Sequence, residues 1–243
     1  MSRFYVPKEA VRAGAIFVSG DEAHHILDVM RLKVSDEVVA FDGSGKEYVG
    51  FVKEAGHKSL TIQISRTREA AEKASKSVTL IQAITKKDKM DYIVEKATEL
   101  GVGSIVPVVT ERTIVRWDDE KKSSSVKRWQ RIAREAAKQC GRLDVPDIAA
   151  VRSFDEAAKD MSKYDRVLLA ALADGAVILR EALKDFSGKD IAVAIGPEGD
   201  FTPKEIAIAR QSNTRLVNLG QRVLKSDTAG LAVLAILNYE FSN

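Results

Sequence analysis

The chain has 243 residues, of which 45% are hydrophobic and 30% charged, and its formal net charge is +3 at pH 7. This length and composition fit a globular protein with a substantial core, built as one large domain or two ordinary ones. A single cysteine, Cys140, excludes an internal disulfide framework and favours a reducing cytoplasm.

The sequence also disfavours a membrane-spanning segment and a metal-binding site. The longest apolar run near the C-terminus, GLAVLAIL, is too short to span a bilayer, and the N-terminus has no segment of signal-peptide type. The three histidines have no metal-ligand spacing with the lone cysteine. The sequence therefore predicts a cytoplasmic protein with neither a membrane segment nor a metal centre.

The first 70 residues are predicted to form a small β-barrel module with one short helix at Asp21–Leu32. Asp42-Gly43-Ser44-Gly45 between two β-rich runs is a strong hairpin signal, because such turns need positive φ angles. Residues 67–77 have the composition of a linker. The expected strands are Glu37–Phe41, Lys46–Lys53 and Leu60–Ile64.

From Ser77 onwards strands alternate with helices, which predicts a parallel α/β sheet covered on both faces. The expected strands are Val78–Ile84, Ile105–Val109, Arg166–Ala171 and Ile191–Ile195. Asp88–Leu100 is an amphipathic helix that Gly101 ends, and Ser124–Cys140 is a longer helix. The inward face of the longer helix is expected to hold Val126, Trp129, Ile132, Ala133, Ala136, Ala137 and Cys140.

Two glycine-centred loops near the C-terminus are the main functional signal. The segments Ile191–Ile206 and Arg215–Leu237 each run from an apolar strand through a glycine turn into a helix. Two such loops can build a ligand pocket from backbone groups outside the carboxyl ends of parallel strands. Neither loop reads GxGxxG or GxxxxGK[ST], so a dinucleotide or nucleoside-triphosphate site is not the first interpretation.

The helices that follow these loops are well defined in the sequence. Thr202 is a natural N-cap, Pro203 occupies the first helical position, and Glu205 completes a capping box. The last helix, Thr228–Phe241, is apolar almost all round and must therefore be buried on more than one face. Core burial alone and a homodimer interface are both possible explanations.

Positive charge is concentrated in residues 85–142, which hold 14 basic and 9 acidic residues. A local basic band on a nearly neutral protein is the footprint expected of a nucleic-acid-binding surface, and a solvated helix face is the alternative.

Five motifs in order give the chain a resemblance to a known family. They read RFYVP, HHILDVMRLKVSDEVVAFDG, KKDKMDYIVEKATELGVGSIVPVVTERTIVRW, REAAKQCGRLDVPDI, and GPEGDFTPKEI with LGQRVLKSDTA. Together they resemble the RsmE family, the SPOUT methyltransferases that methylate N3 of a uridine in 16S ribosomal RNA. The resemblance implies an α/β SPOUT trefoil-knot methyltransferase domain at residues 76–243, preceded by a PUA-like β-barrel RNA-binding domain at residues 1–70.

The resemblance also implies a cofactor, S-adenosyl-L-methionine, without a metal, and a homodimer that acts on 16S rRNA or the small ribosomal subunit. Backbone groups would read the adenine edge, and apolar side chains would enclose its faces. Carried over by motif, the cofactor pocket comprises Leu172, Ile195, Gly196, Pro197, Glu198, Gly199, Leu219, Gly220, Val223 and Leu224.

Methylation at N3 of a uridine requires loss of the ring proton and alignment of the nitrogen with the sulfonium methyl group. A cation near the uracil would stabilise the developing anion, and Arg112, Arg222 and Lys225 are the candidates. Glu198 could instead accept the proton or orient a group. The expected RNA contacts are Arg3, Arg31, Lys86, Lys87 and Lys89, with Arg134, Lys138 and Arg142 as weaker candidates.

Three positions depart from the family pattern. Asp200 stands where a second glycine is common, and a cap for the next helix, together with Thr202, is its expected role. Lys225 and Asp227 stand where Arg and Glu are commoner, and Gln221 replaces a frequent proline.

Two alternatives stay open: a SPOUT methyltransferase on another RNA, such as a ribose 2′-O-methyltransferase, and a non-catalytic rRNA-binding assembly factor. A nicotinamide-dependent dehydrogenase is disfavoured because GxGxxG is missing.

Overall fold

The computed structural model describes residues 3–69, 76–115 and 117–241. The chain forms two compact units, Met1–Lys73 with Arg134–Val145 and Ala74–Ala133 with Pro146–Asn243. The expected domain boundaries, residues 1–70 and 76–243, stay a prediction. The contacts add to it that residues 134–145 belong with the N-terminal unit, and residues 70–75 of the expected linker lie outside the described part.

The N-terminal unit is a six-stranded sheet in the order β1-β4-β5-β6-β3-β2. Its strands are β1 (Arg3–Tyr5), β2 (Val11–Arg12), β3 (Ala15–Ser19), β4 (Glu37–Phe41), β5 (Lys46–Ala55) and β6 (Ser59–Glu69), with a 3-10 turn η1 (Lys8–Ala10). The predicted hairpin is confirmed, because β4 and β5 pair antiparallel around the Asp42–Gly45 turn. β6 continues to Glu69, so the first residues of the expected linker belong to a strand instead.

The core of this unit follows from the alternation of side chains along its strands. Ile16 and Val18 of β3, and Leu60 and Ile62 of β6, point to the same side and are buried in one hydrophobic cluster. Their neighbours in the sequence point outwards, as the exposed Phe17 shows.

The expected single helix at Asp21–Leu32 is wrong in its form and its end. A short α-helix, α1 (Asp21–His24), continues as a π-helix, η2 (His25–Val29). Arg31 then adopts a φ of 56°, in the left-handed region that a right-handed helix cannot contain. The helical segment therefore stops before Arg31.

The second unit contains an all-parallel sheet, as predicted, in the order β10-β8-β7-β13-β11-β14-β12, with β9 beside β8. Its strands are β7 (Ser77–Ala83), β8 (Ser104–Val109), β9 (Asp147–Ile148), β10 (Arg152–Ser153), β11 (Arg166–Ala170), β12 (Val177–Ile178), β13 (Asp190–Ile195) and β14 (Thr214–Asn218).

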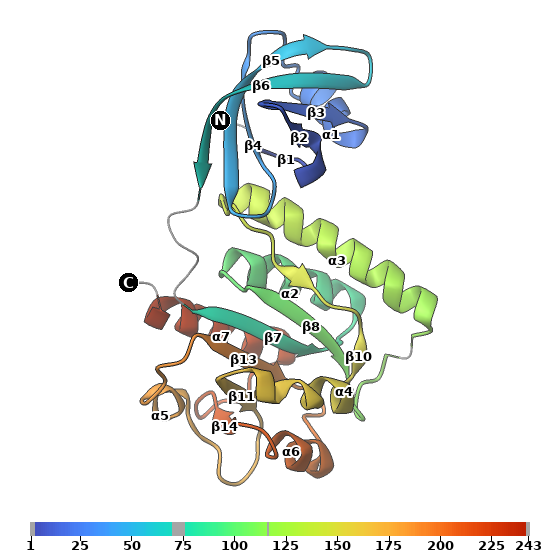
Figure 1. Ribbon diagram of the computed structural model, residues 1–243. Coiled ribbons are helices and arrows are strands. Elements are labelled where there is room, and N and C mark those ends of the chain that lie inside the picture. The colour runs from blue at the N-terminus through green and yellow to red at the C-terminus, as the bar shows by residue number, and fades with distance from the viewer. Residues whose placement is uncertain (1–2, 70–75, 116, 242–243) are drawn as a thin grey trace. The chain divides into compact units, whose positions relative to one another are not determined.

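Helices cover both faces of this sheet (Figure 1). They are α2 (Lys87–Glu99), α3 (Asp119–Cys140), α4 (Phe154–Lys159), α5 (Leu179–Leu183), α6 (Pro203–Ala209) and α7 (Ser226–Phe241), with a 3-10 turn η3 (Met161–Lys163). The two faces follow from the period of two along β7. Ile81 and Ala83 pack in the core with α4 and α6, whereas Leu80 and Gln82 lie beside Gly230 of α7.

Three helices begin earlier than expected, α2 by one residue and α3 and α7 by more. α3 starts at Asp119 because the Asp118 carboxylate accepts a hydrogen bond from the Lys121 N–H at 2.7 Å, the geometry of an N-cap. The expected burial of Cys140 is also wrong, since this side chain is exposed at the end of the helix. α7 starts at Ser226 rather than Thr228.

The return of the chain to the centre of the sheet positions the two glycine loops. β14 lies on the far side of β11 from β13, yet α7, which follows it, packs on β13, β7 and α2. The connection at residues 219–225 must therefore cross from β14 back over the carboxyl end of the sheet. This crossing brings the second glycine loop next to the first, which follows β13.

Candidate functional site

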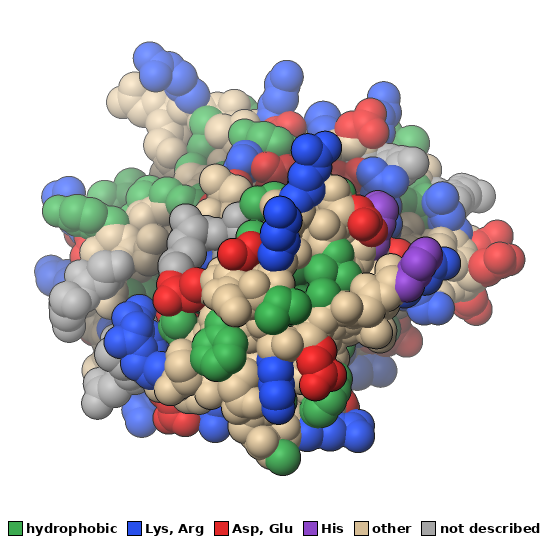
Figure 2. All heavy atoms as spheres, turned by 90° about the horizontal axis from the view of Figure 1, so that it is seen from above, with side chains coloured by type: hydrophobic (Ala, Val, Ile, Leu, Met, Phe, Trp, Pro, Cys, Tyr) green, Lys and Arg blue, Asp and Glu red, His purple; other side chains and the backbone are tan. Residues whose placement is uncertain are grey.

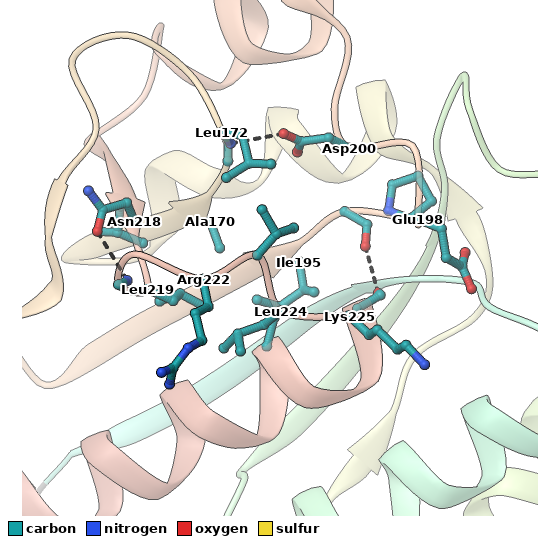
Figure 3. Close-up of a pocket in the computed structure, with 18 residues that line it drawn as sticks. Ala170, Leu172, Ile195, Glu198, Asp200, Asn218, Leu219, Arg222, Leu224 and Lys225 are labelled. Atoms are coloured by element: carbon teal, nitrogen blue, oxygen red, sulfur yellow. Dashed lines mark hydrogen bonds between the residues drawn. The ribbon is translucent and has the colours of Figure 1, made fainter.

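A pocket of about 240 Å³ opens at the carboxyl ends of β11, β13 and β14 (Figure 3). Parallel strands end at the same edge of a sheet, and the connections that follow these three strands meet there. The pocket is lined by Ala170, Ala171, Leu172, Ile195, Gly196, Pro197, Glu198, Asp200, Val217, Asn218, Leu219, Gly220, Arg222, Val223, Leu224, Lys225, Ser226 and Ala229.

The structure brings nine of the ten expected cofactor residues together around this pocket. The exception is Gly199, which lies against Arg112: a Cβ on Gly199 would come within 3.3 Å of the Arg112 Cδ. Sequence reasoning missed seven lining residues: Ala170, Ala171, Asp200, Val217, Asn218, Ser226 and Ala229. Asn218 had a local signal, because its side chain accepts a hydrogen bond from the Gly220 N–H two residues later, as turn-forming asparagines do.

The first glycine loop is held by the helix that follows it. The predicted capping box is confirmed: Thr202 caps α6, and the buried Glu205 carboxylate accepts from the Thr202 N–H at 2.8 Å. The other oxygen of Glu205 accepts from the Glu111 N–H at 2.9 Å. One buried carboxylate thus fixes the start of α6 and the loop after β8 together.

A buried relay joins the two glycine loops. The Ser226 hydroxyl donates to the Gly196 carbonyl at 2.6 Å, and Gln82 of β7 donates to the same hydroxyl at 3.0 Å. All the side-chain atoms of this relay are buried. The start of α7 is thereby tied to the turn that follows β13 (Figure 3).

Asp200 does not cap α6 in the way the sequence suggested, since Thr202 alone makes the capping bond to Glu205. The Asp200 carboxylate accepts from the Phe201 N–H at 2.7 Å and from the Leu172 N–H at 2.9 Å. It therefore links the first glycine loop to the connection after β11.

Apolar side chains lie at the rim of the pocket with much of their surface in solvent. Leu172 is 68% exposed and Val223 is 73% exposed. When a flat apolar ligand covers exposed leucine and valine side chains, apolar surface is removed from water, and this favours binding of the ligand. Their position suits the expected role of enclosing an aromatic base.

The cationic candidates differ in their surroundings. The Arg112 guanidinium donates to the Gly199 carbonyl at 2.7 Å, so it supports the first glycine loop. The side chains of Arg222 and Lys225 are exposed and have no hydrogen-bond or ion-pair partner within the described part of the chain. Both side chains project from the second loop (Figure 3). They are thus available to a substrate.

Glu198 is paired with Lys89 at the pocket. The Lys89 Nζ lies 2.9 Å from Glu198 Oε1, although 109 residues separate them in the sequence. This hydrogen bond lowers the pKa of Glu198 below its ordinary value and raises the pKa of Lys89. A lowered pKa makes the carboxylate a weaker proton acceptor and favours an orienting role for Glu198.

Replacement of Lys89 by methionine is expected to raise the pKa of Glu198 towards its ordinary value, because the hydrogen bond from Lys89 is the main cause that lowers it. An NMR pH titration of the protein with labelled glutamate carboxyl carbons measures this shift. Any part of the dependence of the methylation rate on pH that requires ionised Glu198 would move to higher pH. Lys86→Met is the matched control, and an unchanged Glu198 pKa in Lys89→Met would contradict the pairing.

The expected RNA contacts are not equivalent. Arg31 and Lys86 are exposed, and the side chain of Lys87 lies outside the described part of the structure. The Arg3 guanidinium is largely buried: it pairs with Glu47 at 3.3 Å and lies over the Phe41 ring. Lys89 is engaged with Glu198. The role of all five in RNA binding stays a prediction, and Arg31 and Lys86 are the best placed.

The weaker basic candidates also have partners within the N-terminal unit. Arg134 lies over the Tyr5 ring, and Lys138 lies over Phe4 and pairs with Glu22 at 3.1 Å. Arg142 pairs with Asp144. Lysine and arginine side chains are scattered among acidic ones on the face seen in Figure 2, rather than gathered into one field.

α7 buries only part of its apolar surface. Val233, Leu234 and Leu237 are buried, whereas Ile236 is 43% exposed and Tyr239 is 81% exposed. An apolar strip therefore remains on the outer side of this helix.

Within the described residues there is no cluster of histidine, cysteine and carboxylate groups that could hold a metal ion. The helices in that part of the chain are all too short or too polar to cross a membrane.

Comparisons with known proteins agree on one family. Residues 72–238 match the family described as RNA methyltransferase domain, and residues 18–65 match the RNA methyltransferase PUA domain. The ribosomal RNA small subunit methyltransferase E of Bacillus subtilis is 28% identical over 99% of this chain and 97% of its own length. That of Aquifex aeolicus is 28% identical over 98% of this chain and 99% of its own.

Solved structures give the same result. The ribosomal RNA small subunit methyltransferase E of Neisseria gonorrhoeae, solved with S-adenosyl methionine bound, has a TM-score of 0.86 and 29% identity over 99% of this chain and 98% of that one. A methyltransferase of Legionella pneumophila in complex with the same cofactor has a TM-score of 0.87 and 28% identity, covering 98% of this chain and 97% of that one.

Proposed function

The chain belongs to the RNA methyltransferase family that its residues 72–238 match, and from this premise we propose that it methylates N3 of a uridine in 16S ribosomal RNA. The expected resemblance to the RsmE family and the expected fold are confirmed: a SPOUT α/β trefoil-knot domain follows a PUA-like β-barrel. The coarser activity, S-adenosylmethionine-dependent methylation of ribosomal RNA, is supported by the names of the relatives from Bacillus subtilis and Aquifex aeolicus and by the cofactor bound to the one from Neisseria gonorrhoeae.

The observation that carries this proposal is the pocket between the two glycine loops. Its walls are mostly backbone and apolar side chains, which suit an adenosine group. The surroundings of Gly220 test whether the pocket has room for the cofactor. The φ of Gly220 is 114°, and a Cβ added there would meet nothing within 4 Å. The space beside this glycine is open to a ligand, and the residues present fit the cofactor.

The bound cofactor would supply an electrophilic methyl group on a positively charged sulfur. The protein's own part is to hold a uracil in line with it. As N3 of the uracil gains the methyl group it loses its proton, and the methyl–sulfur bond breaks with its electron pair left on sulfur. Arg222 and Lys225 would stabilise the negative charge that develops on the uracil as the proton leaves.

Arg112 and Glu198 have supporting roles in this proposal. Arg112 holds the Gly199 carbonyl and so keeps the first loop in shape. Glu198, ionised and paired with Lys89, orients groups at the mouth of the pocket. Because its pKa is lowered, Glu198 is a weaker base than an ordinary glutamate, and the proton that leaves N3 passes to solvent in this proposal.

Partners follow from the same premise. We propose that residues 1–70 bind RNA, with Arg31 at the surface, and that residues 76–243 carry out methyl transfer. Small-subunit ribosomal RNA is the substrate, and the cytoplasm is its place of action. The exposed apolar strip of α7, with Ile236 and Tyr239, supports a homodimer through this helix.

Methyl transfer from labelled S-adenosylmethionine tests the proposal. The native protein is expected to label small ribosomal subunits or free 16S rRNA from cells without the endogenous modification, and to leave large-subunit RNA unlabelled. Equal labelling of both RNAs would point to a methyltransferase with another target. Cofactor and RNA binding without any labelling would favour the assembly factor.

A further inference from the structure

The carboxylate of Asp200 bridges two walls of the pocket. One oxygen accepts from the Phe201 N–H within its own loop, and the other accepts from the Leu172 N–H at 2.9 Å, 28 residues away in the sequence (Figure 3). Asp200 and Leu172 both line the pocket. The bond therefore connects the loop after β13 with the connection between β11 and β12.

Burial does not hold Leu172 in place, because 68% of its surface is exposed. Ala171 is buried in the core, and Ala173 and Ala176 pack against it, but the connection at residues 171–176 makes few other hydrogen bonds to the rest of the unit. At its start the Ala171 N–H donates to the Val217 carbonyl at 3.3 Å, and near its far end Arg210 donates to the Asp174 carbonyl at 3.1 Å. The hydrogen bond to Asp200 is the contact that fixes Leu172 relative to the first glycine loop.

The backbone at Asp200 is in a conformation that favours glycine. Its φ is 62°, in the left-handed region, which costs free energy for a residue with a side chain. Aspartate tolerates this region better than most residues, but glycine would occupy it without strain. A strained residue at a ligand pocket indicates that its side chain has a role there.

We propose that Asp200 is a positioning residue that holds Leu172 and its loop in the conformation that binds the cofactor. The proposal rests on the function proposed above for this pocket. A rim that is fixed before the ligand arrives does not lose conformational freedom on binding, so its affinity for the ligand is higher. Asp200 touches no reacting atom, and its effect falls on cofactor affinity rather than on the chemical step.

Two substitutions test this role. Asp200→Gly removes the carboxylate and also relieves the backbone strain, so a loss of affinity cannot come from strain. It is expected to weaken binding of S-adenosylmethionine about tenfold, as loss of a hydrogen bond to a charged group does. Asp200→Asn keeps an oxygen that can accept from Leu172 and is expected to recover affinity to within about threefold of native. In the methylation assay the KM for the cofactor should rise in Asp200→Gly while kcat stays near native.

The control and a second readout separate this role from general stability. Arg210→Gln breaks the attachment at the far end of the same connection, outside the pocket, and is expected to leave affinity unchanged. Amide hydrogen exchange of Leu172 in the protein without ligand should be slow in the native chain and faster in Asp200→Gly.

The outcomes distinguish the two proposals. If the native protein does not bind S-adenosylmethionine, the proposed function fails, and the exchange rate of the Leu172 amide still decides whether Asp200 holds the loop. If the native protein binds and Asp200→Gly binds equally well with unchanged exchange at Leu172, the positioning role is overturned. If Asp200→Gly does not fold, Asp200→Asn decides: a loss as large as tenfold with native stability contradicts the rescue that the proposal requires.

Discussion

Tryptophan in place of Gly220 is expected to abolish binding of S-adenosylmethionine. Gly220 lines the pocket, and the place where its Cβ would stand has no other atom within 4 Å, so an indole there would fill space meant for the ligand. The φ of 114° adds strain, because residues with a side chain rarely adopt it. A loss of at least about a hundredfold in affinity is expected, measured by isothermal titration calorimetry.

Gly20 offers a matched control for this substitution. Its φ is 70°, and a Cβ added there also meets nothing within 4 Å, but it belongs to the N-terminal unit and does not line the pocket. Gly20→Trp therefore introduces a similar strain and the same side chain without filling the pocket. It should bind the cofactor like the native protein. Equal binding by Gly220→Trp and Gly20→Trp would exclude this pocket as the cofactor site.

Alanine in place of Arg222 is expected to lower kcat about a hundredfold, the size of effect seen when one group that stabilises a developing anion is removed. The side chain is exposed at the pocket and has no partner within the described part of the chain, so its charge is free to act on a substrate. Cofactor affinity should change by less than about twofold, because the expected contact is with the uracil.

Single-turnover methylation with saturating cofactor measures this effect on the chemical step. Arg222→Lys should retain part of the rate, since the charge remains but the planar fork is lost. Arg180→Ala, an exposed arginine of α5 outside the pocket, is the control and should be fully active. A native rate in Arg222→Ala would assign the stabilising role to Lys225, and the same measurement on Lys225→Ala would then decide.

Local signals predicted the parts of the site that lie within a few residues of one another. Thr202, Pro203 and Glu205 define the start of α6 by contacts within one turn, and the structure confirms them. The Asp42–Gly45 hairpin is equally local. Such features depend on backbone angles and on hydrogen bonds between residues that are close in the chain. The residue types in a short segment are therefore enough to predict them.

Contacts between distant segments could not be predicted in this way. The sequence gives no sign that Lys89 meets Glu198, that Asp200 meets Leu172, or that Gln82 supports Ser226. The same applies to basic residues: whether Arg3 faces an RNA phosphate or an internal glutamate depends on what the fold places beside it. The charge pattern alone therefore predicted more unpaired basic side chains than the described structure has. The order of the strands was needed to identify the segments that line the pocket.

The measurement that tests the central claim most directly is the identity of the methylated nucleoside. Small-subunit RNA labelled by the native protein would be digested to nucleosides and analysed by chromatography and mass spectrometry, with Gly220→Trp as the inactive comparison. The account predicts N3-methyluridine as the labelled product, formed by the native protein and absent with Gly220→Trp. A ribose 2′-O-methylated nucleoside, or a methyl group on another base, would contradict it.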